Sequence, residues 1–247
     1  ASFMAPVEPG YGEGRYQVLF SNEGGIASST TTDVTIATAA AAGLRMICGT
    51  GAPLYTPSIP VRPMNSVTLQ GPAGADVELS VSATSGALFN ANSANTLTVR
   101  LDETGFGFAQ VYSYATGNVP INAYVISEPQ LSARASMTFT FWLYGQGELA
   151  YYGVSTGAAA DGRSLCSVYL RSSAFSAATR ATLTLNTASS ATITTSGRQT
   201  AYINIGATHA GGFDIIDATA ESVSFTLSLL NISGAYISSS VVFSAFN

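Results

Sequence analysis

Short runs in which apolar and polar residues alternate dominate this chain. Clear examples are 16–20, 77–81, 96–101 and 137–141, and clusters of Gly, Ser, Asn and Pro separate such runs. A period of two is typical of a β-strand with one face in a core. Thr and Ser fill the outward positions, so the predicted surface is polar without being charged. Only 35–44 has a weak helical pattern, and the sequence therefore predicts an all-β protein.

The runs repeat along the chain at a constant spacing. A shift of 104 residues carries Leu79 onto Leu183 and brings several later apolar runs into register. A repeat of this length matches one immunoglobulin-like β-sandwich, which has ~100 residues. We therefore predict tandem immunoglobulin-like sandwiches, one over 60–143 and one over 144–247.

The first part of the chain, 1–59, holds about three predicted strands, too few for a core of its own. We expect this β-rich segment to pair with the neighbouring domain or with another subunit. Its alternating Tyr16, Val18 and Phe20 form a candidate self-assembly strand, because an exposed strand can add to the sheet of another copy. Charges normally protect such strand edges, and this chain has few.

Composition narrows the range of partners. Charged residues make up 9% of the chain and the net charge is -5, whereas an average soluble protein has roughly 25% charged residues. Such a composition suits a protein whose surface its neighbours largely cover, or one coated in Ser, Thr, Asn and Gly. All nine basic residues are dispersed arginines, so no nucleic-acid partner is expected. No apolar run approaches the ~18 residues of a membrane span.

The beginning of the sequence has neither the basic nor the apolar region of a secretory signal peptide. Two explanations are open: a signal was removed ahead of Ala1, or the protein was never exported, as for a virion component.

Two cysteines, Cys48 and Cys166, are present. An isolated pair excludes a cysteine-rich scaffold and a Cys-type zinc site. One long-range disulfide and two buried free thiols are both compatible with this spacing.

Candidate catalytic groups are few. His209 is the single histidine, and a Ser-His-Asp triad would need it together with Asp214 or Asp217. A Gly-x-Ser-x-Gly pattern surrounds Ser155, but a nucleophile elbow lies between a strand and a helix, and no helical pattern follows here. We therefore predict no catalytic residues, no cofactor and no enzymatic activity.

Acidic residues are also sparse. Asp102 and Glu103 sit in an Asp-x-x-Gly turn that ends at Gly105. They could join a calcium site with turn carbonyls, but a calcium cage needs six to eight oxygen ligands. We expect turn residues and no metal site.

Aromatic residues gather at the predicted junction between the sandwiches: Trp142, Tyr144, Tyr151 and Tyr152. Three interpretations are open. The cluster is an inter-domain core that fixes the angle between the sandwiches, a contact for a neighbouring subunit, or a stacking platform for sugar. We favour the first.

The repeat resembles the bacterial Ig-like domains of intimin- and invasin-type surface proteins. The matching pieces are the alternating run 77–82, the Ser-Gly turn in 85–88 and the Asp-x-x-Gly turn opening a strand in 101–109. The second copy departs at 206–212, where Gly-rich sequence replaces that turn. The resemblance covers 66–141 well and 1–59 not at all. It implies a rigid extracellular rod or stalk, whose end module sometimes binds a receptor, and it implies no catalysis.

We therefore expect a non-enzymatic structural subunit of an extracellular bacterial filament, such as a fimbrium, or of an adhesive stalk on the cell surface. Its expected partners are copies of itself and a host receptor or glycan. Two alternatives are open: a phage or virion decoration or fibre protein with the same domains, and a carbohydrate-binding module.

Overall fold

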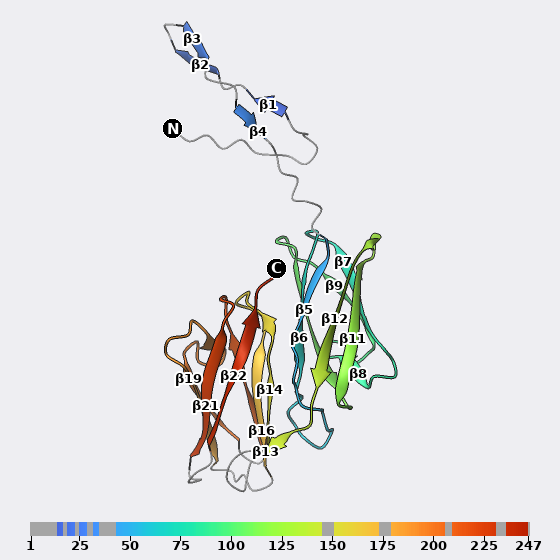
Figure 1. The fold of residues 1–247 in the computed structure, drawn as a ribbon, viewed down its shortest axis with the longest axis vertical. Helices are drawn as coiled ribbons and strands as arrows, with labels where there is room; N and C mark the ends of the chain where they lie inside the picture. The colour runs from blue at the N-terminus through green and yellow to red at the C-terminus, as the bar shows by residue number, and fades with distance from the viewer. Residues whose placement is uncertain are drawn as a thin grey trace. The chain divides into compact units, whose positions relative to one another are not determined.

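The computed structural model describes the backbone of four short N-terminal strands and most of the remaining chain (Figure 1). The described residues after these strands are 43–144, 151–172, 179–205, 209–230 and 236–246. They form β-strands, and no helix occurs among them. The chain divides into two compact units, Ala1–Ala42 and Gly43–Asn247.

The first unit contains two pairs of antiparallel strands. β1 (Gly14–Tyr16) pairs with β4 (Thr32–Val34), and β2 (Leu19–Asn22) pairs with β3 (Gly25–Ser28). The expected single run over 16–20 is therefore divided, because β1 ends at Tyr16 and β2 begins at Leu19. Val18 lies outside the described residues, and so do residues 35–42 of the weak helical pattern predicted over 35–44.

Eight strands form the first sandwich. They are β5 (Arg45–Cys48), β6 (Asn65–Gln70), β7 (Asp76–Val81), β8 (Ala87–Phe89), β9 (Thr96–Arg100), β10 (Phe106–Ser113), β11 (Gly117–Val125) and β12 (Glu128–Phe139). One sheet has the order β5-β6-β10-β8 and the other has the order β12-β11-β7-β9. All pairings within these two sheets are antiparallel.

Ten strands form the second sandwich. They are β13 (Leu143–Tyr144), β14 (Tyr151–Ser155), β15 (Ala158–Ala159), β16 (Cys166–Arg171), β17 (Arg180–Leu185), β18 (Thr192–Ile193), β19 (Thr200–Asn204), β20 (Ala210–Ile216), β21 (Ser222–Leu230) and β22 (Tyr236–Ser244). Its sheets have the orders β13-β14-β16-β20-β18 and β15-β22-β21-β17-β19.

The two sandwiches share one strand order. β14, β16, β20 and β18 occupy the places of β5, β6, β10 and β8, and β22, β21, β17 and β19 occupy the places of β12, β11, β7 and β9. Strands related by the 104-residue shift are thus equivalent in three dimensions. β5 lies before residue 60 and pairs with β6 of the first sandwich. The sequence predicts that the segment 1–59 pairs with the neighbouring domain or with another subunit, and β5 pairs with the domain. The domain boundaries themselves stay a prediction.

Each sandwich buries its own apolar core. In β7, Val77, Leu79 and Val81 are buried while the residues between them are more exposed, as the alternating pattern predicts. The equivalent Leu183 and Leu185 of β17 lie in the second core. The predicted all-β fold, with tandem immunoglobulin-like sandwiches and a short β-rich N-terminal segment, is confirmed.

Candidate functional site

The equivalent strands β6 and β16 are buried on both faces. One face of each strand packs into the core of its own sandwich, and the other face is covered by the other sandwich. On β6 the inter-sandwich face carries hydroxyls. The Ser66 hydroxyl donates to the carbonyl of Leu165 (2.7 Å) and accepts from its N–H (3.2 Å). The Thr68 and Ser164 hydroxyls also bond each other. Buried polar groups with partners fix geometry, so these bonds hold one sandwich against the other.

The segment 49–54 makes a second set of hydrogen bonds between the sandwiches. Thr50 exchanges two backbone hydrogen bonds with Thr156 of the second sandwich, at 2.7 and 2.8 Å. The next residue, Gly51, donates its N–H to Thr138 of β12 in the first sandwich, at 2.7 Å. One extended segment therefore bonds to both sandwiches, which limits any hinge motion between them.

The predicted aromatic cluster at the junction forms only in part. The guanidinium carbon of Arg171 lies 4.8 Å from the ring centroids of both Trp142 and Tyr151. The Tyr144 ring lies against Tyr151 in a tilted arrangement, with 4.7 Å between centroids and 43° between the ring planes. Tyr152 instead packs against the core of the second sandwich.

The members of the cluster differ in burial. Trp142 is buried with Ile59, Tyr169 and Ala210, and its indole N–H donates to the carbonyl of Leu54 at 3.0 Å. Tyr144, in contrast, is 81% exposed. Trp142 thus has the surroundings of an inter-domain core residue, and Tyr144 is the member that remains available at the surface. The role of the cluster stays a proposal.

The structure does not assemble the candidate triad. His209 precedes β20, and Asp214 lies five residues further along that strand, roughly 17 Å away. The Asp214 carboxylate accepts a hydrogen bond from Ser167 at 2.6 Å. Ser155 is buried, and its hydroxyl accepts from the Ser167 N–H at 3.2 Å. Among the described residues, no group of three His, Cys, Asp or Glu side chains that could hold a metal ion is found.

The Asp102 carboxylate is hydrogen-bonded within its own turn. One carboxylate oxygen accepts hydrogen bonds from the Thr104 hydroxyl (2.6 Å), the Thr104 N–H (2.9 Å) and the Phe106 N–H (3.0 Å). The pKa of Asp102 is lowered to about 2, chiefly by the Thr104 hydroxyl and then by the Phe106 N–H. Gly105 has φ +81, so the turn expected from the Asp-x-x-Gly pattern is confirmed. The second oxygen accepts from Arg163 of the other sandwich at 3.0 Å.

Both cysteines are free thiols. Cys166 lies in the core of the second sandwich, and Cys48 packs against the core of the first. Burial raises the pKa of each thiol to about 12. Because the thiolate is the reactive form, neither cysteine has the surroundings of a nucleophile.

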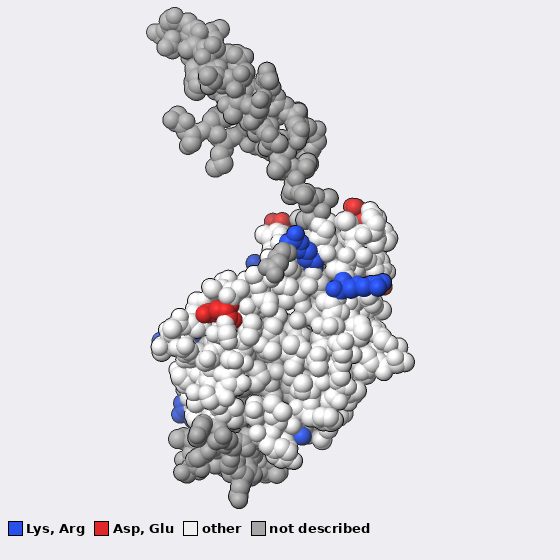
Figure 2. Space-filling view, in the orientation of Figure 1, with Lys and Arg blue, Asp and Glu red and all other residues white. Residues whose placement is uncertain are grey.

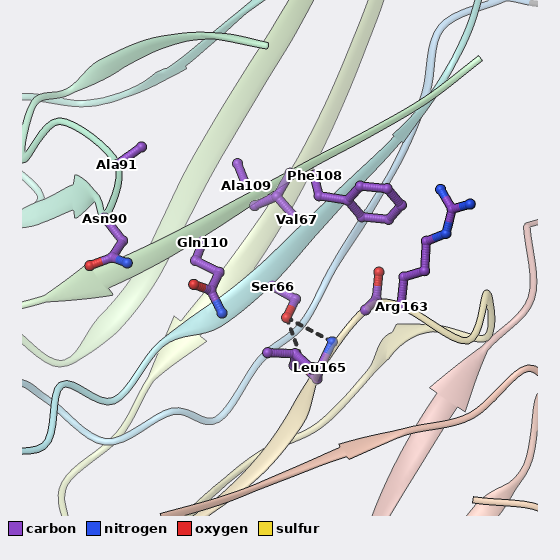
Figure 3. Close-up of a pocket in the computed structure, with 10 residues that line it drawn as sticks. Ser66, Val67, Asn90, Ala91, Phe108, Ala109, Gln110, Arg163 and Leu165 are labelled. Carbon is purple, nitrogen blue, oxygen red and sulfur yellow. Dashed lines mark hydrogen bonds between the residues drawn. The ribbon is translucent and has the colours of Figure 1, made fainter. Parts of the chain in front are cut away.

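A groove runs along the boundary between the sandwiches (Figure 3). It encloses about 340 Å³ between the outward face of β10 and the loop that carries Arg163 and Leu165. Phe108 points toward Arg163, and Gln110 lies further along β10. The guanidinium carbon of Arg163 is 5.8 Å from the centroid of the Phe108 ring. The groove therefore combines an aromatic ring, an amide and a cation in one ligand-sized feature.

Sequence reasoning missed this groove, although the signal is present. Along β10 the small residues Gly107 and Ala109 alternate with Phe106, Phe108 and Gln110. The small residues face the core, where a Cβ on Gly107 would lie 2.7 Å from a Leu101 methyl carbon. A strand that places its small residues inward must present its large ones outward, so this alternation predicts an aromatic face.

Charge is sparse across the surface. Figure 2 shows one face of the molecule, on which most of the described surface is uncharged and the few charged groups are scattered. Within the part of the chain that is described, no helix has the length and hydropathy needed to cross a membrane.

No family model matches this sequence, and no curated protein matches it. Several solved structures are similar. Invasin, a bacterial integrin-binding protein, is 17% identical over 82% of this chain and 39% of its own, with a TM-score of 0.32. Domains 4–9 of the surface layer protein SbsC are 12% identical over 94% of this chain and 35% of their own, with a TM-score of 0.38.

A glycosyl hydrolase family 2 member from Bacteroides cellulosilyticus is also similar, 12% identical over 81% of this chain and 28% of its own, with a TM-score of 0.29. The chain spans less than half of each of these three proteins. The similarity to invasin agrees with the resemblance seen in the sequence. At these identities the similarity concerns the fold alone.

Proposed function

We propose that this chain is a non-enzymatic structural subunit of a multi-copy assembly at a cell surface, a filament or an adhesive stalk. In this proposal the two sandwiches act as one rigid block, and residues 1–42 contact a neighbouring copy. One observation carries the proposal: residues 1–42 form a unit separate from 43–247, and the strands described in it make only two-stranded sheets.

Two-stranded sheets are marginally stable by themselves in water, because they bury little apolar surface. The unit Ala1–Ala42 is also close to the size of ~40 residues below which a domain usually needs a disulfide, a metal or a partner. Both cysteines lie in the other unit. We therefore infer that residues 1–42 are stabilised by packing against a partner surface. A second copy of this chain is a partner that is always present.

Strand addition is the contact that suits these residues. Tyr16 ends β1, where it pairs with Thr32, and Phe20 lies in β2, where it pairs with Ala27. A strand in a two-stranded sheet has a second edge, which can accept another strand. β2 and β3 carry no charged residue, whereas Arg15 of β1 lies opposite Asp33 of β4. We therefore retain Tyr16, Val18 and Phe20 as the proposed self-assembly segment, with Tyr16 and Phe20 acting from two different strands.

The rigid block supports the same function. The bonds from Ser66 to Leu165 and from Thr50 to Thr156 join the sandwiches through buried or backbone groups. A subunit that transmits force or position needs such fixed geometry. The low charge, 9% of residues, is unusual for a surface that faces only solvent, and contact with neighbouring copies explains it.

Truncation tests the proposal. We would compare the full chain with a variant lacking residues 1–42 by size-exclusion chromatography with light scattering, over a wide concentration range. The full chain should form multi-copy species and the truncated chain should be a monomer with an unchanged melting temperature. A double variant, Tyr16→Ser with Phe20→Ser, should weaken assembly without the loss of a segment.

Assembly that persists after truncation would overturn the role of residues 1–42. A full chain that stays monomeric at every concentration would overturn the multi-copy subunit. A virion decoration or fibre subunit would share this architecture. Immunogold labelling of whole cells and of virus particles separates the two functions. A cell-surface subunit predicts label on the cells, and a virion subunit predicts label on the virus particles.

A further inference from the structure

We propose that the outward face of β10 binds a neutral linear oligosaccharide, held in the groove between the two sandwiches. This inference goes beyond the structural function proposed above and does not depend on it, because the groove lies wholly within residues 43–247. It rests on three properties of the groove: an exposed aromatic ring, amide groups with free hydrogen-bonding capacity on the same wall, and a length greater than that of one sugar ring.

The aromatic part of the groove is centred on Phe108. Its side chain is 38% exposed, although it projects from a central strand of the sheet. Phe106, two residues earlier on the same face, meets Phe246 edge to face, with 5.8 Å between the ring centroids. Sugar rings carry C–H groups with a partial positive charge on one face, and the negative face of an aromatic ring attracts them. The exposed Phe108 ring therefore suits stacking against sugar, with the half-buried Phe106 and Phe246 rings beside it.

Amide groups lie beside the aromatic rings. Asn90 accepts a hydrogen bond from the Arg62 guanidinium at 2.9 Å through its side-chain oxygen, so its NH₂ group remains available. No residue in the described part of the chain bonds the side-chain amide of Gln110, which lies along the groove in Figure 3. Gln110 therefore offers both donors and an acceptor, and Asn90 offers the two donors of its NH₂ group. Adjacent sugar hydroxyls present the same combination.

The groove is longer than one sugar ring. A second hollow, of about 500 Å³, continues past Phe106 and Phe246 and shares Phe108 and Arg163 with the first. The distance along β10 from Phe106 to Gln110 is roughly 13 Å at the rise of a strand. The site therefore fits a chain of sugars, with stacking at one end and hydrogen bonds at the other.

Charge in the groove favours a neutral ligand. Arg163, the cation of the groove wall, is paired with Asp102 at 3.0 Å. Its charge is largely balanced, while its remaining N–H groups can still donate to hydroxyls. An acidic glycan would gain little from a guanidinium that already has a carboxylate partner.

An extended peptide suits this face less well. β6 pairs with one edge of β10 over Phe106–Val111. On the other edge, the N–H groups of Asp102 and Asn90 already bond the carbonyls of Phe106 and Gln110, both at 2.8 Å. An added strand would therefore find no continuous free edge, and recognition must use the side chains of the face.

Calorimetric titration of the full chain with defined hexasaccharides tests the proposal. The probes are cellohexaose, xylohexaose, chitohexaose and mannohexaose, with hexagalacturonic acid as the acidic member. At least one neutral hexasaccharide should bind, and Phe108→Ala and Gln110→Ala should each weaken that binding at least tenfold. Tyr202→Ala, which removes another exposed aromatic ring on β19 of the second sandwich, should leave the affinity unchanged.

The proposal is overturned if none of the neutral probes binds, if only the acidic probe or a peptide binds, or if binding survives both groove substitutions. Light scattering on Phe108→Ala, measured in parallel, should show assembly like that of the unmodified chain. Failure of glycan binding and failure of assembly are thus separate results.

Discussion

The hydroxyl of Tyr169 is hydrogen-bonded to both backbone groups of Met64. It accepts from the Met64 N–H at 3.1 Å and donates to the Met64 carbonyl at 3.3 Å, across 105 positions of sequence. Tyr169 belongs to β16 of the second sandwich, and Met64 directly precedes β6 of the first. Burial raises the pKa of Tyr169 to about 12, so the hydroxyl keeps its proton near neutral pH. One side chain thus satisfies a backbone donor and a backbone acceptor of the other sandwich.

Removing this hydroxyl should destabilise the block. Tyr169→Phe keeps the ring in place and leaves both Met64 groups without this partner, at a cost of ~1–3 kcal/mol in the free energy of unfolding. The melting temperature, measured by calorimetry, should fall. Tyr202→Phe removes a hydroxyl from an exposed ring and serves as the matched control. Equal melting temperatures for the two variants would contradict a linking role for Tyr169.

Close packing between the segment 49–54 and β14 gives a second prediction. A Cβ on Gly153 would lie 2.3 Å from a ring carbon of Pro53, so Gly153→Ala forces the two backbones apart. Overpacking of this kind costs ~1–3 kcal/mol. Gly43→Ala is the control, because a Cβ there meets nothing within 4 Å. Denaturant unfolding of both variants checks the prediction, and a Gly153→Ala variant as stable as Gly43→Ala would refute the close contact.

The fold could be predicted from the sequence because it follows from the pattern of apolar and polar residues within each short run. Alternation in runs such as 77–81 determines which residues enter a core, and the constant shift from Leu79 to Leu183 identifies two copies of one unit. The contact between the sandwiches could not be predicted in this way. It depends on Ser66 and Thr68, whose hydroxyls resemble those of any solvent-facing strand until the second sandwich covers them.

The turn at Asp102 predicts how stability depends on pH. Its pKa is lowered to about 2 in the folded protein, against ~3.9 for an unperturbed aspartate. A lowered pKa means that the ionised group stabilises the fold above the unfolded-state value, and that this stabilisation is lost as the pH falls from about 4 toward 2. Asp102→Asn should flatten the decrease in melting temperature over this window. Identical pH profiles for the two proteins would rule out this contribution.

The cysteines provide a prediction about covalent structure. Both are free thiols in the structure, and burial raises the pKa of each to about 12. Ellman's reagent should therefore find two thiols in denaturant without reductant and react slowly with the native protein at pH 8. Cys48→Ser should leave one thiol. Absence of thiols in the denatured, unreduced protein would instead establish the disulfide alternative.

The candidate sites were partly accessible to sequence reasoning. Trp142 and Tyr151 come together around Arg171, as their proximity in the sequence suggested, but Tyr152 faces a core because neighbouring strand residues point in opposite directions. The β10 groove needs Arg163 from the second sandwich beside Phe108 from the first. No local pattern indicates which loop of one sandwich will lie across which strand of the other.

Negative-stain electron microscopy of the native full chain tests the central claim most directly, since the claim is that many copies assemble through residues 1–42. The account predicts ordered particles or filaments with a repeating subunit, and their loss in the variant that lacks these residues. Uniform single-copy particles from the full chain, at concentrations where a surface assembly would form, would contradict it.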